Sequence, residues 1–203
     1  MIKVHHLNES RSRRILWLLE ELELPYEIQT YQRIPETREA PPELKSAHPL
    51  GKSPVMEDGP VKIAESGAII EYLCATYGGG RLGRGPADAD WPAYIEWIQY
   101  AEGSAMLPLV MKVYLAGSAD AGAPVHARVE SEIRTHLGYC EGAMAGRQFL
   151  VGDSLTGADV MISIVLELAR RFDRLKDYPN LDAYLDRLQA RPANRRGLAR
   201  ANG

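Results

Sequence analysis

Residues 2–31, IKVHHLNESRSRRILWLLEELELPYEIQTY, contain two short polar–apolar stretches on either side of a leucine-rich one. Ile2 to His6 is short and partly β-branched, which predicts a strand. The apolar residues of the middle stretch recur at helical spacing: Ile15, Leu16, Leu18, Leu19 and Leu22. Leu24-Pro25 ends this helix, and Tyr26 to Tyr31 predicts a second strand. The order strand, helix, strand favours a parallel pair joined by a right-handed crossover.

The next elements extend this unit. Pro42 to Ala47 predicts one or two helical turns, with proline at an early position where its missing N–H matters little. Asp58-Gly59 lies between two short strands and indicates a hairpin. A further helix runs from Ser66 to Tyr77. The pattern β-α-β, then α, then β-β-α is compatible with a single mixed sheet carrying helices, which makes residues 1–79 an α/β domain.

The second part of the chain has a different character. The Gly/Pro-containing stretch that begins with Gly78-Gly79-Gly80 predicts a linker over residues 80–88. Almost no strand signal follows, and helices are expected over about 89–115, 125–145, from near Asp159 and from near Leu181. Residues 89–203 are therefore predicted to form an all-α domain, with a small-residue loop over 117–122. The basic run Arg191 to Arg200 is read as a solvated tail.

The composition limits the class of function. The chain has 203 residues, a formal net charge of −3, 45% hydrophobic and 25% charged residues, as in an ordinary globular protein without a nucleic-acid surface. No apolar run approaches the roughly 18–20 residues of a membrane span, and the first residues lack the pattern of a secretory signal. Cys74 and Cys140 have neither CxxC nor metal-ligand spacing, so both are expected to be buried thiols. A cytoplasmic protein without a metal site fits best.

Three local features carry possible chemistry. Ser53-Pro54 precedes a predicted strand, where a proline belongs at the strand end or in a turn. Glu65-Ser66 opens a helix, whose first N–H groups lack internal partners and attract anions; simple helix capping is the alternative interpretation. Ser10 lies before the first helix, where its hydroxyl could donate to a thiolate, and either Ser10 or Ser12 could instead cap that helix.

A fourth feature is read as structural. Thr156 and Asp159 precede an apolar helix with the spacing of a capping box, with Asp in place of the more usual Glu.

Together and in this order, these features resemble the cytosolic glutathione transferase family. The resemblance rests on SRSRRILWLLEELELPYEI, HPLGKSPVMED, ESGAIIEYL and VGDSLTGADVMIS, which span residues 10–163. Each stretch is weak alone, but their order and spacing are specific. LNESRSRRILWLLEEL and WIQYAEGSAMLP most resemble a subgroup typified by a fungal transferase and its bacterial relatives.

The resemblance implies a thioredoxin-like first domain followed by the all-α domain. It implies a cis bond before Pro54, and backbone pairing of Ser53 with the cysteinyl part of glutathione. Lys52 occupies the position of a residue that approaches one end of glutathione. Glu65 and Ser66 match the acidic-serine pair that holds the γ-glutamyl group, while the Thr156 and Asp159 box is a folding element.

The catalytic position departs from the family pattern. Glu9 aligns with the serine of several classes, and a carboxylate there would raise the pKa of a neighbouring thiol. Ser10 is therefore expected to be the thiolate-stabilising residue. Ser12 and Asn8 are alternatives, and Arg11 is a further candidate as a cation near the thiolate.

The implied activity is conjugation, or thiol-dependent reduction of peroxides, with glutathione as co-substrate and a small hydrophobic electrophile. The role would be detoxification, and family members are typically homodimers. Residues expected to line the electrophile pocket are Trp97, Tyr100, Met106, Leu107, Met111 and Tyr114. Two alternatives stay open: a non-catalytic interaction module on the same fold, and a glutathione-dependent disulfide oxidoreductase.

Overall fold

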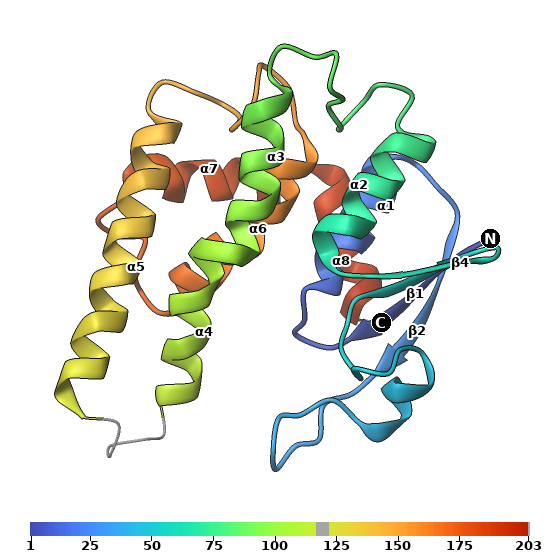
Figure 1. Cartoon of the computed structure of the whole chain (residues 1–203), viewed down its shortest axis with the longest axis horizontal. Helices are drawn as coiled ribbons and strands as arrows, with labels where there is room; N and C mark the ends of the chain where they lie inside the picture. The colour runs from blue at the N-terminus through green and yellow to red at the C-terminus, as the bar shows by residue number, and fades with distance from the viewer. Residues whose placement is uncertain (117–121, 203) are drawn as a thin grey trace. The chain divides into compact units, whose positions relative to one another are not determined.

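The computed structural model describes residues 1–116 and 122–202 of the chain (Figure 1). Most of the loop predicted over 117–122 thus lies outside the described residues. The chain divides into two compact units, one of residues 1–83 together with 189–203 and one of residues 84–188. The boundaries expected from the sequence (1–79, a linker over 80–88, and 89–203) stay a prediction. In the structure the last residues group with the first unit, for the reason given below.

A four-stranded mixed sheet forms the centre of the first unit. The strands are β1 (Ile2–Leu7), β2 (Tyr26–Tyr31), β3 (Val55–Asp58) and β4 (Val61–Ala64), in the order β2-β1-β3-β4. The predicted parallel pairing of β1 with β2 is confirmed, and β3 runs antiparallel to both of its neighbours. The β3–β4 turn contains Gly59 at φ 56°, a left-handed conformation that costs glycine little.

Helices pack against this sheet. They are α1 (Ser12–Glu21), the short η1 (Pro42–Ser46), α2 (Ser66–Tyr77) and α8 (Pro192–Asn202). Figure 1 shows α1, α2 and α8 on the same side of the sheet. The leucine-rich face of α1 is fully buried with the sheet residues Val4 and Val55. Each such Leu or Ile contributes about 1.5–3 kcal/mol when removed from water, so this interface is the core of the unit.

The helix α8 corrects the prediction of a solvated basic tail at Arg191 to Arg200. One stripe of this helix is buried, and its members are small or short: Ala193, Asn194, Gly197 and Ala201. A Cβ placed on Gly197 would lie 2.9 Å from the backbone nitrogen of Trp17. Small side chains at a spacing of three to four residues let α8 approach the backbone of α1 closely. Because the segment is rich in arginine, its sequence predicts solvent exposure and does not indicate this buried stripe of small residues.

Three arginines in or next to α8 have partners in the first unit: Arg191, which immediately precedes α8, and Arg196 and Arg200 within it. Arg191 donates to both carboxylate oxygens of Glu21, at 2.6 and 2.9 Å, and Arg196 Nε donates to Glu20 at 2.7 Å. The Arg200 guanidinium lies 3.8 Å from the centroid of the Tyr26 ring. Burial pushes the pKa of Glu21 upward, but the hydrogen bonds from Arg191 and Trp17 outweigh it and lower the pKa. The C-terminal segment is thus held electrostatically to α1.

The second unit is helical, as predicted. Its helices are α3 (Trp91–Tyr100), α4 (Met106–Leu115), α5 (Ala123–Met144), α6 (Gly157–Arg171) and α7 (Pro179–Ala190). The single helix expected over 89–115 is wrong in detail, because the π-helical segment η2 (Ala101–Ala105) separates α3 from α4. Gly103 lies in η2, and nothing lies within 4 Å of a Cβ added there. Among the described residues, no neighbouring segment therefore packs closely against Gly103.

The capping box at the start of α6 is confirmed. Thr156 N donates to Asp159 Oδ2 at 2.7 Å, while the Thr156 side chain faces the first-turn backbone. Asp159 also accepts from Leu150 N at 2.9 Å and from the Tyr184 hydroxyl. Burial raises the pKa of Asp159 despite these hydrogen bonds. The box therefore ties α6 to the preceding loop and to α7.

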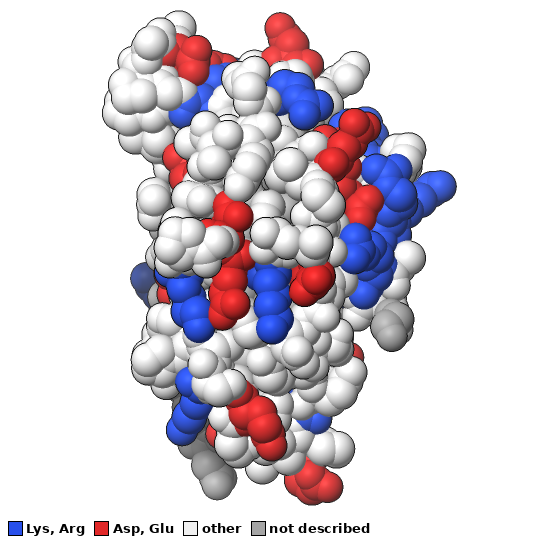
Figure 2. Space-filling view, turned by 90° about the vertical axis from the view of Figure 1, so that its right-hand side faces the viewer, with Lys and Arg blue, Asp and Glu red and all other residues white. Residues whose placement is uncertain are grey.

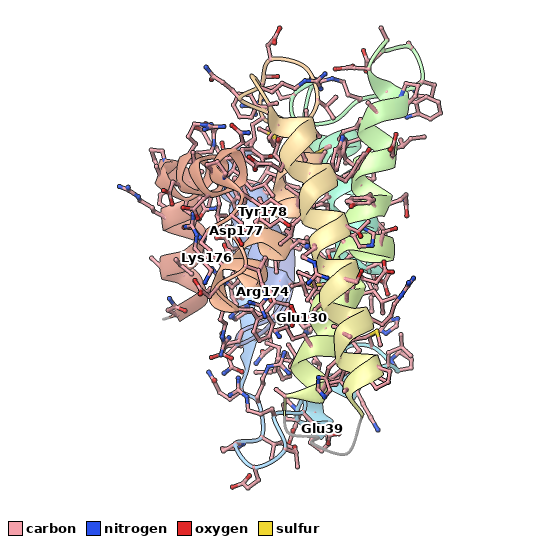
Figure 3. The ribbon with its side chains drawn as sticks, turned by 90° about the vertical axis from the view of Figure 1, so that its left-hand side faces the viewer. Glu39, Glu130, Arg174, Lys176, Asp177 and Tyr178 are labelled. Atoms are coloured by element: carbon pink, nitrogen blue, oxygen red, sulfur yellow. The ribbon has the colours of Figure 1, made fainter. Side chains whose placement is uncertain are left out.

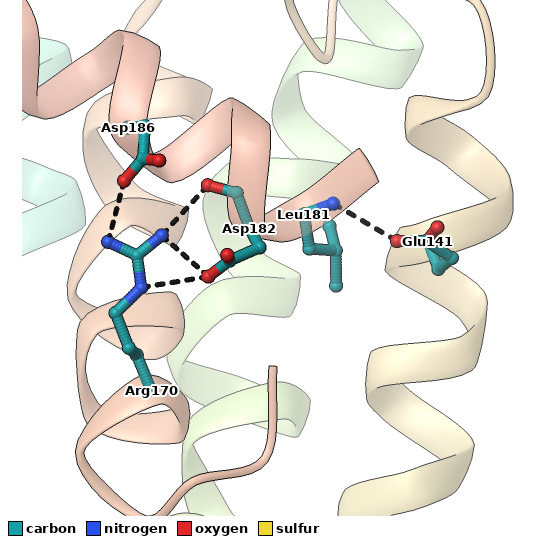
Figure 4. A network of polar contacts seen from close by, with 5 residues as sticks. All are labelled: Glu141, Arg170, Leu181, Asp182 and Asp186. Carbon is teal, nitrogen blue, oxygen red and sulfur yellow. Dashed lines mark hydrogen bonds and ion pairs between the residues drawn. The ribbon is translucent and has the colours of Figure 1, made fainter. Parts of the chain in front are cut away.

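Polar contacts join the remaining helices of this unit. Figure 4 shows Arg170 of α6 donating to Asp182 and Asp186 of α7, with 2.9 Å between Arg170 Nη1 and Asp186 Oδ1. In the same view Glu141 of α5 accepts from Leu181 N at 3.0 Å. These contacts fix α7 between α5 and α6.

A second polar cluster lies on α5. Glu130 pairs with Arg174 at 3.0 Å, and Figure 3 labels the two side chains next to one another. Lys112 of α4 also pairs with Glu130, so one carboxylate joins two other segments to α5.

The surface agrees with the small net charge. On the face drawn in Figure 2, acidic and basic side chains lie interspersed among uncharged residues, and basic ones gather along one margin beside acidic ones. No helix of the described residues is both long and apolar enough to cross a membrane. Cys74 and Cys140 are buried and are not joined in a disulfide, as expected.

Candidate functional site

The junction between β1 and α1 carries the predicted catalytic position. The strand ends at Leu7, and Glu9 turns the chain at φ 50°, a left-handed conformation that is uncommon for a non-glycine residue. Arg11 is the N-cap residue of α1 and makes no side-chain capping bond. Ser10 immediately precedes Arg11, and Ser10 Oγ accepts from the backbone nitrogen of Ser12, the first residue of α1, at 3.3 Å, so the capping hydrogen bond expected of Ser10 is present.

The two residues before Ser10 are Asn8, one of the alternatives, and Glu9, and both contact the loop that follows β2. Asn8 Oδ1 accepts from the backbone nitrogen of Arg33 at 2.8 Å, which secures the loop after β2. The exposed Glu9 carboxylate pairs with Arg38. Both side chains therefore help to hold the loop that follows β2.

The serines are placed differently. Ser12 is fully buried, and its Oγ lies 2.7 Å from both His6 Nδ1 and Ser10 Oγ. Ser10 is only half-buried and lies at the outer end of this chain of hydroxyls. Of the two, Ser10 is the one that a ligand can reach.

A second loop brings Ser53 to the same place. Ser53-Pro54 is a cis peptide bond, as the resemblance implied, and it precedes β3. Ser53 Oγ donates to the carbonyl of His5 at 2.8 Å and accepts from Leu7 N at 3.2 Å, so it bridges to the end of β1. Its Oγ lies 3.3 Å from that of Ser10. Two residues 43 positions apart in the sequence thus form one hydroxyl cluster.

The start of α2 presents a second polar group. Glu65 is its N-cap residue, exposed, with φ 70° and ψ 121°, a sparsely populated conformation that costs a non-glycine residue of order 1–3 kcal/mol. Ser66 is 3% exposed, and its Oγ accepts from Arg14 Nη1 at 3.4 Å. With a lone pair occupied by Arg14, the Ser66 hydroxyl keeps its proton for an acceptor.

This arrangement suits an anionic group. The first N–H groups of α2, the Ser66 hydroxyl and the buried guanidinium of Arg14 place partial or full positive charge at one point. The Glu65 carboxylate lies beside it on the surface. A ligand carrying a carboxylate next to an ammonium group, such as the γ-glutamyl end of glutathione, matches this pair of charges.

The other predicted binding residues flank these groups. Lys52 is exposed and immediately precedes Ser53, while Arg11 is half-buried at the start of α1. Pro54 is buried at the start of β3.

Sequence reasoning missed Arg14 and His6. Arg14 lies among the apolar residues of α1 and is 1% exposed, and His6 is 1% exposed within β1. A charged or titratable residue inside an apolar pattern is the signal that marks both positions, because such groups are rarely buried without a partner. The partners, Ser66 and Ser12, lie on segments whose proximity only the fold reveals.

The residues expected to line an electrophile pocket fall into two groups within the second unit. Trp97 and Met106 are buried core residues. Leu107, Met111 and Tyr114 of α4 are exposed, Tyr114 by 77%. Tyr100 donates or accepts a hydrogen bond with His136 Nδ1 at 2.8 Å and stacks edge-on against Trp97.

Comparisons with known families assign both units. Residues 1–75 match the model of the glutathione S-transferase N-terminal domain, and residues 102–192 match that of the C-terminal domain. These matches cover most of the chain, so it belongs to the glutathione S-transferase family, and its enzyme class is that of the glutathione transferases.

Particular relatives support this assignment. The chain is 36% identical to glutathione S-transferase 1 of Saccharomyces cerevisiae, covering 91% of this chain and 88% of the relative. It is 31% identical to glutathione S-transferase 3 of Schizosaccharomyces pombe, covering 96% and 86%. The expected resemblance to a fungal-type subgroup is thus confirmed.

Solved structures agree on the fold. A glutathione S-transferase from Actinobacillus pleuropneumoniae superposes with a TM-score of 0.89 at 33% identity, covering 100% of this chain and 94% of the other. A family member from Pseudomonas fluorescens, solved with two glutathione molecules bound, gives a TM-score of 0.84 at 25% identity, covering 97% and 92%.

Proposed function

We propose that the first unit binds reduced glutathione along the Ser10, Ser53 and Ser66 side chains, and that the bound thiolate attacks a small apolar electrophile. Glutathione is the co-substrate of this reaction. The observation that carries the proposal is the 3.3 Å approach of Ser10 Oγ to Ser53 Oγ at the start of α1. This approach brings Ser53, which is expected to pair with the cysteinyl backbone of glutathione, next to Ser10, whose hydroxyl is expected to contact the sulfur.

The γ-glutamyl end is proposed to bind at the start of α2. Its carboxylate accepts from the Ser66 hydroxyl and the first backbone N–H groups of the helix, and its ammonium group pairs with Glu65. Arg14 favours this binding mode, because its hydrogen bond to Ser66 Oγ leaves the hydroxyl proton of Ser66 available to the ligand carboxylate. Lys52 and Arg11 are proposed to approach the glycyl and cysteinyl parts.

The proposed role of Ser10 is energetically sufficient. A thiol with a pKa near 8.5 is only a few per cent ionised at pH 7. Lowering the pKa by about two units takes about 2.7 kcal/mol of differential stabilisation. A hydroxyl hydrogen bond to an ion supplies about 1.5–3 kcal/mol, and the N-terminal end of α1 adds roughly 0.3–1 kcal/mol.

The electrophile is proposed to meet exposed apolar side chains of α4, namely Leu107, Met111 and Tyr114. Their exposure supports this, since apolar groups left on the surface are available to an apolar molecule. We further propose, from the family resemblance, that the protein works as a homodimer in the cytoplasm.

The two alternative functions are less well supported. A disulfide oxidoreductase using a protein cysteine needs a reactive thiolate, and burial raises the pKa of Cys140 to about 12. A non-catalytic module that had lost its ligand would have no need to keep the Ser66–Arg14 pair and the strained Glu65 backbone at one helix start.

Calorimetric titration with reduced glutathione tests the proposal. The wild-type protein should bind, Ser66→Ala should bind about tenfold or more weakly, and Ser10→Ala should bind nearly as well as wild type. Loss of one hydrogen bond to a charged group, about 1.5–3 kcal/mol, sets the Ser66→Ala value. Ser46→Ala, a change at an exposed serine in η1, is the matched control. Absence of binding at millimolar glutathione would overturn the proposal and favour the interaction module.

A further inference from the structure

The buried histidine of β1 forms one end of a hydrogen-bond chain that reaches the proposed thiol site. His6 Nε2 lies 3.0 Å from the carbonyl oxygen of Ala201, and His6 Nδ1 lies 2.7 Å from Ser12 Oγ. Ser12 Oγ in turn lies 2.7 Å from Ser10 Oγ. His6 and Ser12 are 1% and 0% exposed, so only the Ser10 end opens toward a ligand.

Chemistry fixes the direction of every hydrogen bond in this chain. A carbonyl oxygen only accepts, so Nε2 carries the ring proton, and Nδ1 of a neutral His6 has a lone pair. Ser12 must then donate to Nδ1. Because the Ser12 proton is thereby used, Ser10 must donate to Ser12. Ser10 consequently turns a lone pair, and not a proton, toward its open side.

Ser53 does not change this result. Its proton is engaged by the carbonyl of His5 at 2.8 Å, so toward Ser10 it has only lone pairs to offer. The single proton of Ser10 goes to Ser12 at 2.7 Å in preference to Ser53 at 3.3 Å. In its resting state the site therefore complements an S–H group better than an S⁻ group.

We propose that His6 is a positioning residue for thiol ionisation, which receives the proton of bound glutathione through Ser10 and Ser12. The inference rests on the proposed function. The S–H bond breaks and its proton passes to Ser10 Oγ, while the proton of Ser10 moves to Ser12 Oγ and that of Ser12 to His6 Nδ1. The electron pair stays on sulfur, both hydroxyls end neutral, and a thiolate and an imidazolium result.

The transfer leaves the site suited to the thiolate. Each hydroxyl has reversed its direction, so Ser10 now donates to the sulfur that gave up its proton. In an addition reaction the proton returns along the same chain to the carbanion that C–S bond formation leaves on the adduct. His6 is thus regenerated in each cycle.

The surroundings of His6 fit an acceptor that is neutral at rest. Burial lowers the pKa of His6, the charge of Arg13 on α1 lowers it further, and the bond to Ala201 opposes both. Ala201 belongs to the last turn of α8, whose carbonyls lack partners within the helix and form its negative end. That end stabilises an imidazolium once the negative thiolate has formed. The helix α8 therefore stabilises protonated His6 in addition to packing on α1.

Nitrogen NMR of protein labelled at histidine tests the relay directly, because a protonated Nδ1 has a shift distinct from that of a lone-pair Nδ1. Reduced glutathione at saturation should convert His6 to the imidazolium form at pH 7. S-Methylglutathione, which has no thiol proton, should bind and leave His6 neutral. The imidazole ring of His5, which hydrogen-bonds to Tyr31 and pairs with Glu57, is the internal control and should respond to neither.

Two variants separate the relay from a structural role. Ser12→Ala interrupts the chain without removing His6, so glutathione should bind with His6 still neutral and the bound thiolate reduced at least tenfold. His6→Gln keeps a polar group beside Ser12 but cannot be protonated, and should shift the pH profile of kcat/KM upward by about one unit or more. His5→Gln should leave that profile unchanged.

The outcomes distinguish the two proposals. If glutathione binds and ionises while His6 stays neutral in the wild-type protein, the relay is wrong and the proposed function stands. If glutathione does not bind, the proposed function and the relay both fail.

Discussion

The replacement Gly197→Ala tests how closely α8 approaches α1. The added Cβ would lie 2.9 Å from Trp17 N, 3.0 Å from Trp17 Cα and 3.1 Å from the carbonyl carbon of Leu16. All three are backbone atoms that no side-chain rotation can move, and favourable contact needs about 3.5–4.0 Å. The helix must therefore shift, and overpacking of this kind costs about 1–3 kcal/mol. Alanine regains about 1 kcal/mol of helix propensity relative to glycine.

A matched glycine isolates the steric part of this change. Gly138 is exposed in the middle of α5, with nothing within 4 Å of an added Cβ, so Gly138→Ala should gain the propensity alone. Gly197→Ala should thus be about 1–3 kcal/mol less stable than Gly138→Ala, and each kcal/mol corresponds to about 2–4 °C in Tm for a chain of this size. Thermal unfolding measures the difference, and hydrogen exchange should show faster exchange confined to α8. Equal stability of the two variants, with α8 amides unchanged, would refute the close approach.

Three further outcomes are expected. Glu21→Gln should cost stability at neutral pH, and the difference from wild type should vanish as the pH falls. The folded state lowers the pKa of Glu21, so its contribution to stability is present above the unfolded pKa near 4.5 and is lost as the pH drops through the folded pKa. A constant difference in urea unfolding across that range would contradict this. Thr156→Ala should destabilise the second unit by about 0.5–2 kcal/mol in the same unfolding assay, and no change would mean that the capping box contributes little. Cys140, buried with a pKa of about 12, should react with a thiol reagent only at the rate of unfolding, so rapid labelling in native buffer would be inconsistent with its burial.

The first unit followed from its sequence because local and long-range signals agree there. The apolar period of α1, the proline that ends it and the Asp58-Gly59 turn each specify one element, and the handedness of crossovers leaves few ways to combine them. The capping box was equally readable, since Thr156 and Asp159 are three residues apart.

Features that depend on tertiary contacts could not be predicted from the sequence. The sequence predicts a solvated tail at α8, because the buried stripe of this helix consists of small residues and Arg196 finds its partner on α1, which is distant in sequence. The π-helical η2 depends on how neighbouring helices pack, which a propensity scale does not record. At the site, Ser10 and Ser66 were predicted as candidates, whereas Arg14 and His6 emerged only when the fold placed them against those serines.

The central claim is that the start of α1 ionises the thiol of bound glutathione. Ultraviolet absorbance of the thiolate, measured on saturated complexes at pH 7, tests it most directly. The account predicts that thiolate predominates on the wild-type protein and on Ser46→Ala, and falls toward the few per cent of free glutathione on Ser10→Ala. A wild-type complex that binds glutathione as the neutral thiol, or a Ser10→Ala complex with undiminished thiolate, would contradict it.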